Sequence, residues 1–246
     1  MAKRQDIDTI LREWDFTPGE VRARIVKAHN GRKVLQMRVE LGLLQMELEQ
    51  RPDGTRPGGF DTYFDYLLSL AFKGGEKFEL SEEQCGEADR EFMQFYHRRL
   101  CWLELREFRR AVQDANHTLD FMDFVRAHSS DEEWILAHEQ YRPFVLFHRT
   151  QAASLAELEE NGPEAAVEEI HRGLEAIRDV FVEYGAEEHF DDDELVTRLR
   201  ELRDSIREHF GIGRTLREQL DDAVAAEEYE LAAKLRDELA KKKPDA

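Results

Sequence analysis

Histidines, cysteines and acidic residues are the side chains of this 246-residue chain that could do chemistry. The nine histidines form no HExxH or other ligand spacing, and the one beside an acidic run is His189, before Asp191–Glu194. Cys85 and Cys101 form neither a CxxC pair nor a zinc knuckle. The chain also lacks GxxxxGK[ST], GxSxG and GxGxxG motifs. We therefore predict no catalytic residue, no metal site and no cofactor.

A short basic segment, residues 21–39, stands out in this acidic chain. It contains no acid, and its cations are Arg22, Arg24, Lys27, Arg32, Lys33 and Arg38. Such a segment is a candidate to contact a phosphate backbone or an acidic partner. Because no aromatic residue is interleaved for base stacking, nucleic acid is the less favoured ligand. The alternatives are a solvated hairpin face, protection of an edge strand by charge, or contact with the chain's own acidic helices.

The overall charge limits the classes of partner. Acidic residues outnumber basic ones by 54 to 35, which gives a formal net charge of −19. General binding of polyanions is not expected, because this field repels phosphate. Hydrophobic residues make up 41% of the chain, enough for a core in one or two domains. The chain has two cysteines, no long apolar run and no signal-peptide core in its first residues, which predicts a cytoplasmic protein without a membrane partner.

The N-terminal segment 1–60 is predicted to be a small β unit. Asn30-Gly31, the dipeptide best suited to a type I′ turn, separates two extended arms. In the second arm apolar and polar residues alternate, and the alternation shifts at Gly42, where we expect a bulge or a sharp bend. The proline- and glycine-rich run Arg51–Gly59 then ends the unit.

Residues 61–210 are predicted to form a helical body. The segments with helical spacing of apolar residues are Phe60–Phe72, Ala88–Leu105, Phe108–Val125, Asp131–Leu158, Pro163–Tyr184 and Asp191–Phe210. Two of them share a weak internal repeat, in which Ala111-Val112 aligns with Ala166-Val167. Both resemble the second helix of a tetratricopeptide repeat. Because the spacing is 55 residues instead of 34, a TPR-like stack and an irregular helical bundle both stay open.

Two apolar stripes predict a helical hairpin over residues 211–246. The first stripe is Leu216, Leu220, Ala223 and Val224, and the second is Tyr229, Ala232, Leu235 and Leu239. The pattern changes phase at Ala226–Glu228, where the chain folds back. Such a hairpin buries little surface by itself, so it packs either on a partner or on its own domain.

This hairpin segment, residues 215–242, resembles the UvrB/UvrC motif, or UVR domain. The matching residues are Leu216, Leu220, Ala223, Val224, Glu228, Tyr229, Glu230, Ala232, Ala233, Leu235, Arg236, Asp237 and Leu239. In the excision-repair proteins UvrB and UvrC, the chaperone ATPase ClpC and the kinase activator McsA, the module is an antiparallel helical hairpin for protein–protein contact. The resemblance implies a docking element. The sequence lacks motifs for the helicase and nuclease modules of those families and for the cysteine metal sites of McsA.

We therefore expect a mostly helical, non-enzymatic adaptor protein with a β-hairpin unit, a TPR-like body and a C-terminal UVR hairpin. The expected protein-binding residues are Leu216, Leu220, Val224, Tyr229, Ala232, Leu235, Arg236, Asp237 and Leu239. Arg236 and Asp237 would set the orientation of the partner through a charge-assisted bond, or would be a solvated surface pair.

The expected partner is another protein that carries a UVR-type hairpin, or a second copy of this chain in a homodimer. The resemblance makes excision-repair and Clp-type chaperone machinery the candidate partners. The alternative function, from a different class, is a nucleic-acid-binding DNA-repair accessory that uses the basic segment 21–39.

Overall fold

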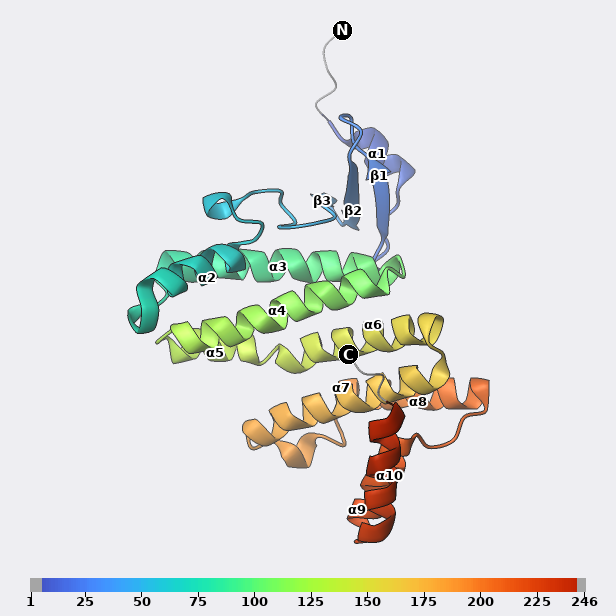
Figure 1. The fold of residues 1–246 in the computed structure, drawn as a ribbon. Helices are drawn as coiled ribbons and strands as arrows, with labels where there is room; N and C mark the ends of the chain where they lie inside the picture. The colour runs from blue at the N-terminus through green and yellow to red at the C-terminus, as the bar shows by residue number, and fades with distance from the viewer. Residues whose placement is uncertain (1–5, 243–246) are drawn as a thin grey trace. The chain divides into compact units, whose positions relative to one another are not determined.

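The computed structural model of the chain describes residues 6–242, without the side chains of Glu76 and residues 240–242. The chain divides into two compact units, Met1–Val145 and Leu146–Ala246. The fold is mostly helical with a small antiparallel sheet near the N-terminus, as predicted (Figure 1). The three-part division into 1–60, 61–210 and 211–246 stays a prediction, and its outermost residues, 1–5 and 243–246, lie outside the described residues.

The sheet belongs to the first unit and has the order β1-β2-β3, with both pairs of neighbours antiparallel. Its strands, which follow the short helix α1 (Asp8–Glu13), are β1 (Ala23–Lys27), β2 (Lys33–Val39) and β3 (Gly42–Met46). The first turn is where the sequence places it, but it is not type I′. Among its residues only Gly31 has a positive φ, of 87°, and its amide N–H donates to Ala28 O at 2.8 Å. This combination fits a type I turn followed by a glycine bulge.

Of the two alternatives that the sequence predicts at Gly42, the bulge is wrong and the sharp bend is confirmed. The shift in alternation marks a complete reversal of the chain, with Val39 opposite Gly42 across a two-residue turn. The polar side of the predicted alternation is not a solvent face either, because Gln36 and Arg38 are both buried. In an antiparallel sheet of three short strands the central strand is covered from several sides, and local periodicity does not reveal this.

The helices of the first unit follow a 3₁₀ turn at Pro57–Gly59. They are α2 (Tyr63–Gly74), α3 (Glu82–Glu104), α4 (Phe108–His128) and α5 (Glu132–Glu139), with a second 3₁₀ turn at Gly75–Lys77. The long helices α3 and α4 lie side by side (Figure 1). The segment expected as one helix, Asp131–Leu158, is two, because a new helix α6 (Arg142–Glu160) starts just before Pro143. Proline has no N–H to continue the preceding ladder and favours a helix start.

A buried carboxylate organises this helical layer. Glu91 on α3 is fully buried and accepts the backbone N–H of Tyr63 at 2.7 Å and of Phe64 at 3.1 Å, the first amides of α2. Its oxygens also lie 3.3 Å from Arg51 Nε and 3.0 Å from His117 Nε2. The side chain therefore caps one helix from another and ties the proline- and glycine-rich run to both.

The second unit contains most of α6 and the elements α7 (Pro163–Glu183), a 3₁₀ turn (Glu187–His189), α8 (Glu194–Phe210), α9 (Leu216–Ala225) and α10 (Tyr229–Lys242). Its core lies mainly between α7 and α8 and includes Val167, Ile170, Ile177, Val196 and Leu199. Among the described residues, no helix is long and apolar enough to cross a membrane. The TPR-like arrangement of the helical body stays a prediction.

Candidate docking site on the C-terminal hairpin

The first helix of the hairpin, α9, is started by its own sequence. Thr215 accepts the amide N–H of Glu218 with its hydroxyl, and the Glu218 carboxylate accepts the Thr215 N–H at 2.9 Å. This reciprocal pair is a capping box, which satisfies two amides that a helix start leaves open. Upstream, Gly211 ends α8 in the left-handed conformation, with a φ of 65°. The capping box and the glycine together fix where the linker ends and the hairpin begins.

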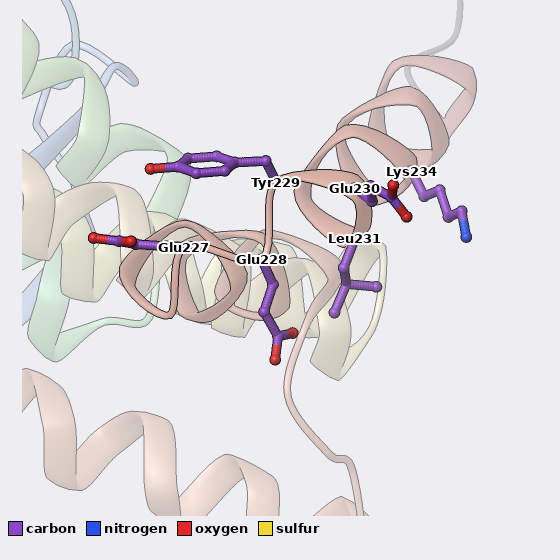
Figure 2. Close-up of a pocket in the computed structure, with 6 residues that line it drawn as sticks. All are labelled: Glu227, Glu228, Tyr229, Glu230, Leu231 and Lys234. Atoms are coloured by element: carbon purple, nitrogen blue, oxygen red, sulfur yellow. The ribbon is translucent and has the colours of Figure 1, made fainter.

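The turn of the hairpin lies where the apolar pattern changes phase. Glu227 has a φ of 58°, and the next amide, of Glu228, donates to Ala223 O at 2.8 Å. A left-handed residue followed by such a bond ends a helix and reverses the chain. Figure 2 shows Glu227 and Tyr229 extending to one side of this turn, away from Leu231 and Lys234. The predicted hairpin is thus confirmed, and its turn carries three acidic side chains, Glu227, Glu228 and Glu230.

The two hairpin helices hold each other through a very small core. Ala223, Ala232 and Leu235 are buried between them, with Leu216 and Leu220 packed at the edge. The alanines permit close approach of the two helices, and Leu235 fills the space beyond them. Leu235 is therefore buried within the hairpin, and its predicted contact with a partner stays a prediction. Leu216 and Leu220 likewise belong first to the hairpin's own core.

The residues that remain for a partner form a second face. Val224 is 53% exposed and Tyr229 is 68% exposed, although both are large and apolar in part. They line a shallow groove together with Leu220, Asp221, Ala225, Ala232, Ala233 and Arg236. Small side chains at its floor let a second helix approach, and the tyrosine offers an amphipathic anchor. Leu239, half-buried, lies further along α10.

Arg236 and Asp237 interact with each other on the surface. Arg236 Nη2 lies 2.9 Å from Asp237 Oδ1, and the two side chains are 70% and 61% exposed. An exposed pair of this kind contributes between about 0 and 1 kcal/mol to stability. Within the hairpin the two charges do not bridge α9 and α10, and their role in orienting a partner stays a prediction.

Polar contacts connect α9 with its neighbours in the second unit. Arg217 Nη1 lies 3.4 Å from Glu168 Oε1 on α7, and Arg207 on α8 pairs with Glu218. Burial acts to raise the pKa of Glu218, but the bonds from the Thr215 amide and the Arg207 guanidinium outweigh it, so this pKa lies below its usual value. The contacts were not predicted, because they join residues whose sequence neighbourhoods carry no common pattern.

The basic segment 21–39 is largely used within the first unit. Arg38 is buried, and its guanidinium donates to Trp14 O at 2.8 Å and to Gly42 O at 2.8 Å. Arg24 lies over the Trp14 ring at 4.1 Å. Arg32 pairs with Glu47 at 2.9 Å, and Arg22 donates to Asp15 O. The remaining two cations, Lys27 and Lys33, are exposed.

The described residues form a mostly helical chain with a small antiparallel helical hairpin, α9–α10, over residues 216–242. Residues 214–243 match the UvrB/uvrC motif, which covers the α9–α10 hairpin. This motif alone is a non-catalytic element, and in UvrB-, UvrC- and ClpC-type proteins it mediates protein interactions. Neither the curated proteins nor the solved structures provide a match to the chain.

Proposed function

We propose that this chain is a non-enzymatic adaptor that docks another protein through its α9–α10 hairpin. The observation that supports this most directly is that the motif match coincides with a hairpin whose own core is already satisfied. What remains is an exposed face with Val224 and Tyr229. Exposed apolar groups beside small residues are typical of helix-in-groove contacts.

The partner that fits this face is a second hairpin of the same type. Two antiparallel hairpins can pack helix on helix when small residues lie at the contact, and Ala225 and Ala233 occupy such positions in the groove. Such a pairing also allows a homodimer, because a self-complementary face generates two-fold symmetry. Excision-repair and Clp-type chaperone complexes are the two classes of machine that we propose as partners. We place the adaptor in the cytoplasm, where free Cys85 and Cys101 stay reduced.

A pull-down with point variants of the full chain tests this proposal. Tyr229→Asp is the test variant, and Tyr141→Asp is its control, because Tyr141 is 59% exposed in the turn between α5 and α6, outside the hairpin. Val224→Asp is matched in the same way by Val182→Asp, at 53% and 51% exposure. Buried charge in an apolar contact opposes binding. We expect mass spectrometry to show partners that the two hairpin variants lose and the two controls retain.

Sedimentation of the purified chain tests the homodimer separately. If the hairpin pairs with itself, the dimer should dissociate in Tyr229→Asp and persist in Tyr141→Asp. Equal partner sets and equal sedimentation for all four variants would contradict docking through this face.

The alternative, binding of nucleic acid by residues 21–39, now depends on few groups. Lys27 and Lys33 are exposed, whereas Arg38 is held by backbone carbonyls inside the unit. Salt-dependent binding to a short DNA or RNA duplex, lost in Lys27→Glu/Lys33→Glu, would favour this alternative. Absence of binding to either duplex at low salt would contradict the nucleic-acid-binding alternative.

A further inference from the structure

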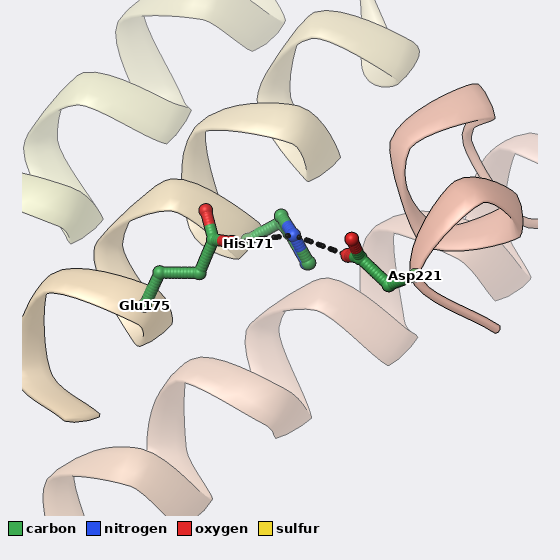
Figure 3. A group of neighbouring side chains, drawn as sticks. All are labelled: His171, Glu175 and Asp221. Atoms are coloured by element: carbon green, nitrogen blue, oxygen red, sulfur yellow. Dashed lines mark ion pairs between the residues drawn. The ribbon is translucent and has the colours of Figure 1, made fainter. Parts of the chain in front are cut away.

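Three potential metal ligands meet between α7 and the docking hairpin. His171 and Glu175 come from α7, and Asp221 comes from α9 (Figure 3). His171 Nε2 lies 3.0 Å from an Asp221 carboxylate oxygen and 3.5 Å from a Glu175 oxygen. The three ligand atoms all lie within 4.8 Å of one another. No pattern in the sequence indicates this group, since one of its members is 46 residues from the next along the chain.

The surrounding structure fixes this arrangement. His171 and Glu175 are four residues apart on one helix, which places both side chains on the same face. Asp221 is brought to that face because α9 is held beside it, through Arg217 with Glu168 and through Glu218 with Arg207. The neighbouring cation of α7, Arg172, pairs with Glu169 at 3.0 Å. Arg172, Arg207 and Arg217 therefore pair with acidic residues other than Glu175 and Asp221.

The His171 ring nitrogen supplies an independent observation. Nε2 is enclosed, and among the described residues it has no hydrogen-bond partner, although two carboxylate oxygens lie within 3.5 Å. The oxygens are close but are not aligned with the ring nitrogen as acceptors or donors. Ligands around one tetrahedral ion are arranged in this way, because each points at the ion and not at its neighbours.

The spacing also agrees with a small divalent ion. Bonds of about 2.0–2.1 Å in a tetrahedron place ligand atoms roughly 3.3 Å apart. The distances of 3.0 and 3.5 Å from Nε2 lie on either side of that value. The carboxylates of Glu175 and Asp221 are about half exposed, at 51% and 50%, so they can turn to close the third edge. One imidazole with two carboxylates favours zinc over calcium or magnesium, which prefer oxygen ligands alone.

We propose that His171, Glu175 and Asp221 bind Zn²⁺ and that the ion tethers α9 of the hairpin to α7. Three protein ligands leave a fourth position to water, and the ion would neutralise the two carboxylates. The site overlaps the docking face at Asp221 alone, since His171 and Glu175 do not line the groove. Zinc binding and docking can therefore be tested separately.

Calorimetric titration of the full chain with zinc sulfate tests the ligand set. We expect one site per chain, with Asp221→Asn and Glu175→Gln each weakening the affinity at least tenfold, since even outer-shell changes cost roughly 10–100-fold. Asp222→Asn is the matched control, because Asp222 is the next residue, is 52% exposed and pairs with Arg214 outside the group. The control should bind zinc like the unchanged chain.

Hydrogen exchange provides a second readout of the tether. Zinc should slow exchange of the α9 amides in the unchanged chain and in Asp222→Asn, and should have no effect in Asp221→Asn. Absence of stoichiometric binding, or affinity that is equal in all variants, would overturn the site. Binding that is lost in Glu175→Gln but survives Asp221→Asn would overturn the tether.

Discussion

The layer of α2, α3 and α4 and the hairpin of α9 and α10 are held together by different interactions. In the first, buried charges connect the elements, with Glu91 fully buried and Arg98 paired to Asp114 at 2.7 Å. In the second, the core among the described residues is apolar and small: Ala223, Ala232 and Leu235 are buried, with Leu216 and Leu220 packed at the edge. Charged residues are therefore structural in one region, whereas in the other the motif leaves apolar residues on the surface.

The two kinds of core indicate where function can be expected. A buried ionic network tolerates little change, because removal of one partner leaves the other uncompensated. A short hairpin with a minimal core is marginal by itself and gains stability from whatever covers it. The hairpin is thus suited to exchange partners, and the helical layer is suited to hold a fixed shape.

The largest expected effect is at Glu91. Replacement Glu91→Gln should lower the free energy of unfolding of the first unit by about 3–5 kcal/mol. The amide NH2 cannot accept the buried N–H of Tyr63 or Phe64, and among the described residues Arg51 would keep only the partly exposed Asp53 and Glu87 as counter-charges. Urea denaturation followed by circular dichroism measures this loss. Glu87→Gln is the control, since Glu87 also pairs with Arg51 but is 30% exposed, and it should cost about 1 kcal/mol or less. Equal losses in the two variants would show that burial of Glu91 has no special role.

The next effect is local to the hairpin. Leu235→Ala removes the largest side chain of its core and should destabilise the hairpin by about 2–3 kcal/mol. We expect hydrogen exchange to accelerate in α9 and α10 and to stay unchanged in α3 and α4. Leu231→Ala on the same helix is the control, because Leu231 is 44% exposed, and it should change little. A cooperative loss of all helices in Leu235→Ala would argue against this independence.

Two helical glycines, Gly173 and Gly86, differ in the space that a side chain would find. A Cβ at Gly173 on α7 would overlap Thr150 of α6, so Gly173→Ala should destabilise by about 1–3 kcal/mol. Gly86 on α3 has nothing within 4 Å of such a Cβ, and Gly86→Ala should stabilise by up to about 1 kcal/mol. Thermal melts of both variants should shift in opposite directions. Adding Thr150→Gly to Gly173→Ala should recover part of the loss, and no recovery would mean that the overlap is not the cause.

The smallest effect concerns pH. The pKa of Glu218 is lowered in the folded chain, so its carboxylate stabilises the native hairpin above the unfolded value near 4.5. That contribution is lost as pH falls through the folded pKa. The opening free energy of the α9 amides, obtained from hydrogen exchange after correction for the intrinsic rate, should therefore fall more between about pH 5 and pH 3 in the unchanged chain than in Glu218→Gln. If the stability of α9 falls equally with pH in the two proteins, Glu218 is not the group responsible for the loss.

The sequence predicted those features that depend on local periodicity and on residue identity. Helical spacing located α3, α4, α7 and α8, and the ordered match at YELAAKLRD identified the hairpin with its turn. The break before Pro143 was missed, and the bend at Gly42 was predicted without its extent, which is a full reversal of the chain. Both are set by a single residue or a short turn, and the periodic signal on either side continues as if one element were present.

The assignment of individual side chains to roles was less predictable. Leu235 and Val224 both lie on apolar stripes, yet one is buried and the other is exposed, because only the approach of α10 to α9 selects the inner face. Arg38 looked like a surface cation and is buried among carbonyl groups. An apolar stripe predicts which face of a helix is buried. The width of the buried part depends on how the neighbouring helix packs against that face.

The helical class, the acidic character and the C-terminal motif can be read from the amino-acid sequence, because they follow from composition, local spacing and side-chain identity. The tertiary structure alone decided which charges are buried and which ligands meet. Glu91 with Arg51 and His117, and His171 with Asp221, join positions far apart in the chain. Such pairs depend on the packing of whole elements, and no short-range pattern records them.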